Sequence, residues 1–206
     1  MGHYQLLAGA CLYIASKCDG RNIKCNDISF CADNVFNGKQ IMGAEDIVLR
    51  QLKWKLAYPV VLDFVLAFVS AAGLQENSRL VWTMRYIAEQ ALQSPIYLSF
   101  KPSLIAASVF VLASICLQEQ DLWPASLARQ TGYGWEDLEA CTVSLSRLVE
   151  DVRSTMPDLI IIERRYRKAT RHQVAELSVP NITSFAAFSA DRQRQLRQVS
   201  HLIPMH

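Results

Sequence analysis

A stretch near the start of this chain recurs almost a hundred residues later. Residues 6–16 align without a gap with residues 104–114, and every aligned pair is identical or similar in size and polarity. The correspondence extends further along the chain, where Phe36, Ile41, Val48 and Leu52 fall on or near Tyr133, Leu138, Leu145 and Val149. A period this long predicts two copies of one compact domain and excludes a solenoid of short repeats.

Helical patterns dominate both copies, and no strand-like alternation of apolar and polar residues persists. Tyr58-Pro59 breaks the chain between the copies, because a residue before proline is disfavoured in a helix. Capping residues, prolines and glycines then set the expected helix ends. The expected helices cover residues 4–18, a short stretch capped by Asp27 and followed by Gly38, and residues 39–53, 60–72, 77–93, 102–118, 124–131 and 135–152.

These limits predict an all-α protein with a partial first domain at 1–57 and a complete second domain at 58–155. Residues 156–206 are expected to form one helix through a basic run and a partly disordered tail. Because residues 4–18 align with the third helix of the second copy, the first copy lacks its two leading helices. Leaving several hundred Å² of apolar surface uncovered costs on the order of 10 kcal/mol, so we expect the first domain alone to be poorly stable.

The sequence gives little evidence for enzyme classes that depend on catalytic histidines, phosphate-binding loops or paired carboxylates. The four histidines lie near the ends of the chain, and neither GxxxxGK[ST] nor GxGxxG occurs. None of the six cysteines forms a CxxC pair, so no zinc site is predicted. No other metal and no cofactor is predicted. The net charge of +2 is too small to predict nucleic-acid or membrane-surface binding by itself, and no apolar run reaches membrane-spanning length.

The first expected helix has Leu-x-Ala near its start and Ala-Ser-Lys up to residue 17, and further characteristic segments follow it in a fixed order. Together they resemble the cyclin family, closest to the A- and B-type (G2/mitotic) cyclins. The resemblance covers roughly residues 5–180. It is carried by the Leu-x-Ala helix that ends in Ala-Ser-Lys at residue 17, and by later segments in both copies. Those segments are 30–36, 39–41, 47–50, 52–56, 102–107, 123–124, 131–133 and 165–168. The resemblance implies two tandem cyclin boxes, the first without its leading helices.

The resemblance also implies a partner, a cyclin-dependent serine/threonine protein kinase. Lys17 and Glu45 match a lysine and a glutamate that bond to the kinase near its C helix. Ile14, Leu49 and Leu56 match apolar positions that pack against the same kinase region. On its residues alone, Glu45 also fits a solvated carboxylate at a helix edge.

Two places depart from the family pattern. Cys18 stands where cyclins usually carry an aromatic residue, and we count it among the expected kinase-binding residues. The early helix that forms much of the substrate-docking patch is absent, so only Tyr4 and Gln5 fall near a remnant of that patch.

The expected function is therefore that of a non-catalytic regulatory subunit that binds and activates a cyclin-dependent kinase at G2 and mitosis, in the nucleus and cytoplasm. ATP and magnesium would belong to the partner, and no small-molecule ligand, direct nucleic-acid contact or membrane contact is expected. Two alternatives stay open. One is a cyclin-like scaffold that does not activate a kinase, and the other is a DNA-binding double box like transcription factor B. The basic run at 164–171 fits a solvated helix face, an acid-binding patch or a nuclear signal.

Overall fold

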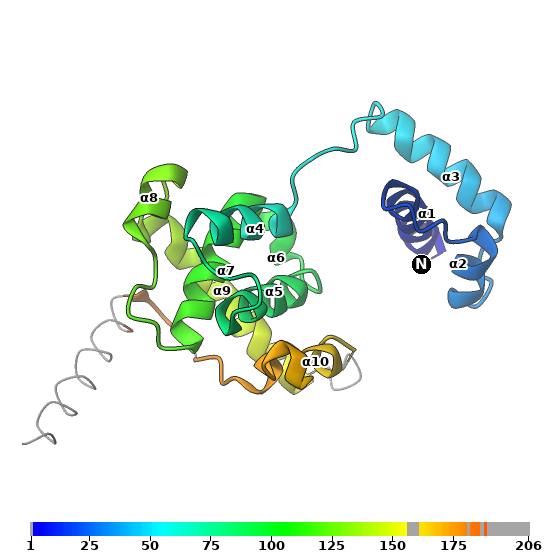
Figure 1. Ribbon diagram of the computed structural model, residues 1–206. Helices are drawn as coiled ribbons and strands as arrows, with labels where there is room; N and C mark the ends of the chain where they lie inside the picture. Colours follow the sequence, from blue (N-terminus) through cyan, green and yellow to red (C-terminus); the bar gives the residue numbers. More distant parts are fainter. Residues whose placement is uncertain (1, 156–160, 181, 186–187, 189–206) are drawn as a thin grey trace, which may run out of the picture. The chain divides into compact units, whose positions relative to one another are not determined.

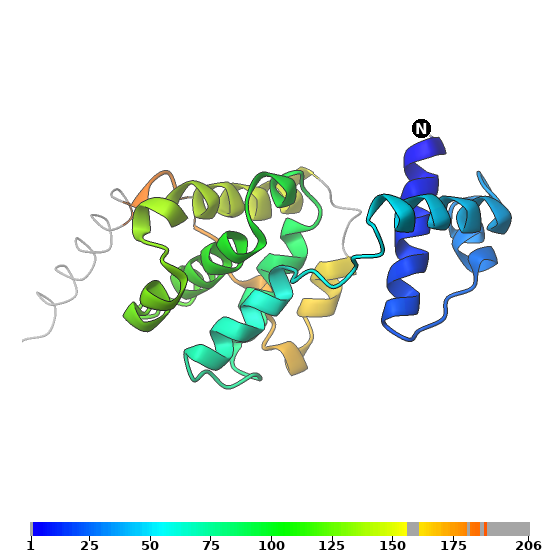
Figure 2. The same ribbon diagram turned by 90° about the horizontal axis from the view of Figure 1, so that it is seen from above.

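The structure is a computed structural model that describes residues 2–155, 161–180, 182–185 and 188. Over these ranges the chain forms α-helices, short 3₁₀ helices and turns, with no strand, as Figures 1 and 2 show. The predicted all-α class is confirmed. The chain divides into two compact units, Met1–Tyr58 and Pro59–His206, which are described separately below.

The first unit consists of α1 (Gly2–Cys18), α2 (Cys25–Cys31) and α3 (Gly38–Gln51). Helix α1 packs against α3 and α2, and α2 packs against α3. Its core is a small cluster of Ile28, Phe36 and Ile41. The unit therefore has three helices that hold one another through a limited set of buried side chains.

A reciprocal capping box starts α3. The Asn37 side chain accepts a hydrogen bond from the Gln40 backbone N–H, and the Gln40 side chain accepts one from the Asn37 N–H. The predicted cap at Asp27 was wrong, because Lys24 is the N-cap residue of α2 and Asp27 lies inside its first turn. Gly38, expected to follow α2, is instead the first residue of α3.

Gly9 marks the closest approach between α1 and the rest of the first unit. A Cβ atom added to Gly9 would lie 3.1 Å from Cζ of Phe36 and 3.3 Å from Cγ2 of Ile28. A Cβ atom at Gly43, in the exposed middle of α3, would have no neighbour within 4 Å. The two glycines therefore differ in whether a side chain fits.

We expect Gly9→Val to lower the free energy of unfolding of the first unit by about 1–3 kcal/mol, because it overpacks the core. Gly43→Ala is the matched control and should raise it by about 0.5–1 kcal/mol, because alanine favours the helix. Urea titration followed through NMR signals of α1 and α3 measures both. A shift of the same sign for both variants would contradict the close packing at Gly9.

The second unit is built around one buried helix, α7 (Pro102–Cys116). It lies against α4 (Val61–Ala71), α5 (Arg79–Ala91) and α9 (Trp135–Thr155), as Figure 1 shows. Every residue from Ile105 to Ile115 is buried. The short helices α6 (Ile96–Ser99), which was not predicted, and α8 (Ala125–Thr131) complete this part, and Gly132 ends α8 in the left-handed conformation with φ of 74°.

The internal repeat is visible in the packing. Helix α1 packs on α3 as α7 packs on α9. Within the described residues of the first unit, nothing corresponds to α4 and α5. Leu7 and Leu12 of α1 are exposed, whereas their counterparts in α7, Ile105 and Phe110, are buried. The predicted pair of boxes, with a first box that shows only the later helices, agrees with this arrangement.

After α9 the described chain resumes with α10 (Ile161–Tyr166), followed by 3₁₀ turns at Ala169–Arg171 and Val174–Glu176. The expected helix through the basic run thus ends at Tyr166, and the rest of the run contains a short 3₁₀ helix instead of a continued α-helix. Tyr166 is buried, and α10 packs on α5. The tail predicted to be partly disordered lies almost wholly outside the described residues. No helix in the described ranges has the length and apolarity needed to cross a membrane.

Candidate functional site

One cavity in the first unit brings together all six residues predicted to bind the kinase. It has a volume of about 430 Å³ and lies between the end of α1, one face of α3 and the segment after α3. Its lining residues are Ile14, Lys17, Cys18, Met42, Glu45, Asp46, Leu49, Trp54 and Leu56. We refer to it as the first-unit cavity.

An ion pair joins the two helices at this cavity. Nζ of Lys17 lies 2.7 Å from Oε1 and 2.8 Å from Oε2 of Glu45, so the contact is bidentate. The Lys17 side chain is 43% exposed and that of Glu45 is 12% exposed. The hydrogen bond to Glu45 raises the pKa of the Lys17 ammonium, which keeps it charged throughout the neutral range. The same ammonium lies 4.0 Å from the ring centroid of Tyr13.

The helical repeat explains why these side chains share one wall. Met42, Glu45 and Leu49 follow one another at intervals of three and four along α3, which places them on one face. Ile14 and Lys17 have the same relation on α1. An ion pair and three apolar positions therefore meet between the two helices.

The end of α3 folds back to complete the wall. The Trp54 N–H donates to the carbonyl of Leu49 and the Lys53 N–H to that of Arg50, which is the double hydrogen bond of a Schellman motif. Lys53 and Trp54 have positive φ values of 50° and 60°, an uncommon conformation for residues other than glycine. This turn places Trp54 and Leu56 on the cavity.

The first-unit cavity suits a protein surface. Its apolar residues include exposed ones, with Trp54 at 66% and Met42 at 55% of full exposure. A contiguous apolar patch with a charged pair beside it is typical of a protein–protein contact. Nowhere in the described ranges do three or more histidine, cysteine or acidic side chains gather in a way that could hold a metal ion.

Sequence reasoning missed three residues of this cavity. Met42 and Asp46 could have been found from the helical spacing, because Met42 lies three residues before Glu45 and Asp46 lies three residues before Leu49 on α3. Asp46 also pairs with Arg50 at 3.0 Å. Trp54 could not have been found from the helical spacing, because its position at the cavity depends on the turn at Lys53. Tyr4 and Gln5 are exposed near the start of α1 and do not line the cavity.

Comparison with known proteins identifies the family. The family model described as "Cyclin, C-terminal domain" matches residues 59–180, and the model described as "Cyclin, N-terminal domain" matches residues 1–57. Similar relatives include cyclin-B1-3 of Arabidopsis thaliana, 30% identical over 84% of this chain and 41% of the relative. Cyclin-A2 of Gallus gallus is 28% identical over 87% of this chain and 45% of the relative. The G2/mitotic-specific cyclin-A of Hydra viridissima is 27% identical over 81% of this chain and 39% of the relative.

The chain thus spans about two fifths of the length of the relatives it matches. The match to the C-terminal model covers more than half of the chain, and the match to the N-terminal model accounts for nearly all of the rest. The order of the two matches is the order of the two compact units. The chain belongs to the cyclin family.

Proposed function

We propose that this protein is a non-catalytic regulatory subunit that binds a cyclin-dependent protein kinase through the first-unit cavity and activates it. One observation carries the proposal: six positions taken from family resemblance, and scattered between residues 14 and 56, converge on a single cavity. The Lys17–Glu45 pair stands at that cavity with apolar side chains around it. This combination supplies both polar anchors and buried contact area to a partner helix.

The ion pair is suited to exchange partners on binding. The Lys17 side of this pair is 43% exposed. An ion pair open to solvent contributes about 0–1 kcal/mol, so rearranging the contact on the Lys17 side costs little. In the complex, Lys17 and Glu45 would bond to kinase groups near its C helix, while Ile14, Leu49 and Leu56 would pack against the same region. The desolvated contacts would then be stronger than the pair is in the free protein.

Activation would follow from a shift in the kinase conformations. A cyclin that binds the kinase better when the C helix is turned inward raises the population of that state. The inward C helix lets its glutamate pair with the ATP-site lysine, as catalysis requires. ATP, magnesium and the phosphoryl-transfer groups all belong to the kinase. We further propose a role at G2 and mitosis, in the nucleus and cytoplasm. Similarity to the G2/mitotic-specific cyclin-A of Hydra viridissima supports the cell-cycle phase.

A pull-down with a purified cyclin-dependent kinase, followed by histone phosphorylation by the complex, tests this function. We expect the kinase to be retained and its activity to rise at least about tenfold over kinase alone, because a tenfold shift needs only ~1.4 kcal/mol of differential binding. A catalytically dead kinase controls for contaminating activity. Retention without a rise in activity would replace activation by the non-activating scaffold. Lack of retention by a folded helical sample would overturn the kinase partner.

A further inference from the structure

The second unit holds a cavity of its own, which the kinase proposal does not use. It has a volume of about 630 Å³ and lies between the start of α4, one face of α5, and α10 with the turn that follows it. Its lining residues are Val60, Val61, Leu62, Trp82, Arg85, Ala88, Glu89, Leu92, Arg165, Tyr166 and Arg171. We refer to it as the second-unit cavity.

Two guanidinium groups at this cavity carry uncompensated positive charge. Cζ of Arg85 lies 5.1 Å from the centroid of the Trp82 indole, and Cζ of Arg171 lies 5.3 Å from it. Nε of Arg85 is buried and has no hydrogen-bond partner. In the part of the chain that the structure describes, no carboxylate lies within ion-pair distance of either Arg85 or Arg171. We call Arg85 and Arg171 the guanidinium pair.

The third arginine, Arg165, is already neutralised. Its Nη1 lies 2.9 Å from Oε2 of Glu89, whose other oxygen, Oε1, accepts a 2.7 Å hydrogen bond from the Tyr166 hydroxyl. Burial, reinforced by the bond to Glu89, raises the pKa of Tyr166, so the hydroxyl stays a donor. Both oxygens of Glu89 are therefore engaged inside the protein, and the guanidinium pair stays open to another anion.

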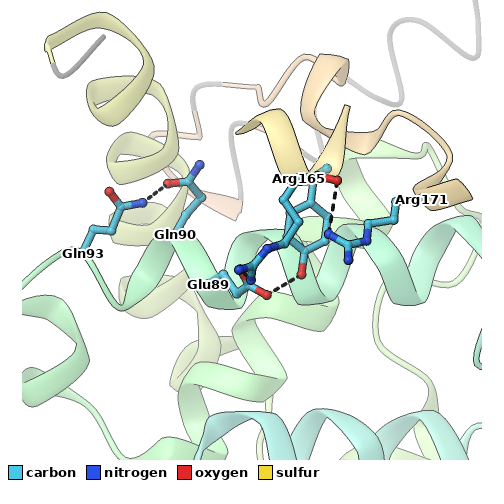
Figure 3. A network of polar contacts seen from close by, with 6 residues as sticks. Glu89, Gln90, Gln93, Arg165 and Arg171 are labelled. Carbon is cyan, nitrogen blue, oxygen red and sulfur yellow. Dashed lines mark hydrogen bonds and ion pairs between the residues drawn. The ribbon is translucent and has the colours of Figure 1, made fainter. Parts of the chain in front are cut away.

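Hydrogen bonds hold this wall in place. Figure 3 shows Glu89, Arg165 and Arg171 close together, and Nη1 of Arg171 donates to the backbone carbonyl of Arg165 at 3.2 Å. Nε1 of Trp82 donates to Oδ1 of Asn77 at 2.8 Å, which fixes the indole that both guanidinium groups contact. A charged surface fixed in this way loses little side-chain entropy when it binds.

The remaining lining residues of the cavity are apolar, and several of them are exposed. Val61 and Ala88 are buried in its floor, whereas Val60, Leu62 and Leu92 at its edge are exposed, Leu92 by 61%. Exposed aliphatic side chains beside an aromatic wall mark a surface that gains from being covered. The cavity thus offers an apolar floor next to a positive wall.

We propose that the second-unit cavity docks a short acidic peptide segment of a partner protein, with an apolar side chain on the floor and aspartate or glutamate side chains on Arg85 and Arg171. Charge complementarity selects the acidic flanks, because, among the described residues, no carboxylate pairs with either guanidinium group. This proposal is independent of the kinase site, which lies in the other unit.

Fluorescence anisotropy with the full chain and a labelled peptide Asp-Glu-Leu-Leu-Asp-Glu tests this site. We expect saturable binding that weakens as salt is added, and no binding of the peptide Lys-Lys-Leu-Leu-Lys-Lys. Arg85→Gln should weaken binding about tenfold, the size expected when one charge-assisted contact is lost. Leu92→Asp should weaken it at least as much, and this exposed position keeps the test valid if Arg85→Gln disturbs folding.

Arg129→Gln is the matched control, because it removes the same charge from α8, outside the cavity, and should leave the affinity unchanged. The proposal would be overturned by absence of binding, or by equal binding of the peptide Asn-Gln-Leu-Leu-Asn-Gln. Unchanged affinity in both Arg85→Gln and Leu92→Asp would overturn it as well. A peptide with phosphoserine in place of the acidic residues that bound more tightly would also overturn it, in favour of a phosphate site.

Discussion

Exchanging the charges of Lys17 and Glu45, in the double variant Lys17→Glu/Glu45→Lys, should lower kinase affinity at least about a hundredfold, because reversed charges at a desolvated contact cost several kcal/mol. The two side chains lie 2.7 Å apart, and the exchange keeps an ion pair between α1 and α3. The first unit should therefore stay folded while it presents the wrong charges to the partner. Calorimetric titration with purified kinase measures the loss.

The corresponding exchange of Glu163, on α10, and Arg167, just after this helix, is the control. That pair is separated by one helical turn, with Nη2 3.5 Å from Oε2, and neither residue lines the first-unit cavity. Its exchange should leave kinase affinity within about twofold of the parent chain, as expected for an exposed pair away from the contact. If the Lys17→Glu/Glu45→Lys variant bound kinase as well as the parent chain, the site assignment would be wrong, whatever the fate of the control.

Most helices of the second unit were predictable because local signals and burial agree. Pro102 starts α7, Ser78 caps α5 through the Val81 N–H, and Gly132 ends α8. The repeat was predictable for the same reason, since α7 is apolar on every side and α1 resembles it closely. At the start of α2, the sequence favours Asp27 as the N-cap because its side chain is the better cap. In the folded chain the N-cap is Lys24, and Asp27 lies in the first turn.

The sites depend on contacts that local sequence does not encode. Lys17 and Glu45 were placed together by resemblance, and only the packing of α1 on α3 shows that they bond to each other. Glu89 and Tyr166 are 77 positions apart and share no pattern that would pair them. The sequence predicts one helix through the basic run, whereas the α-helix ends at Tyr166 and the 3₁₀ helix that follows brings Arg171 to Trp82.

Amide hydrogen exchange in the free chain should be at least about a hundredfold faster in α1–α3 than in α7 and α9, because local stability follows buried apolar contact. The first-unit core is a cluster of Ile28, Phe36 and Ile41, and Leu7 and Leu12 of α1 are exposed. The equivalent face of α7 is buried. Exchange mass spectrometry on the intact chain measures both units in one sample.

Kinase at a hundred times its dissociation constant should slow exchange in α1–α3 by about a hundredfold, since binding stabilises the folded form by about 2.7 kcal/mol. Exchange in α7 and α9 should change little. The Lys17→Glu/Glu45→Lys variant should show no such protection, which links the slowing to the first-unit cavity. Equally slow exchange in both units of the free chain would contradict the prediction, because it would mean that the exposed face of α1 is covered before any partner binds.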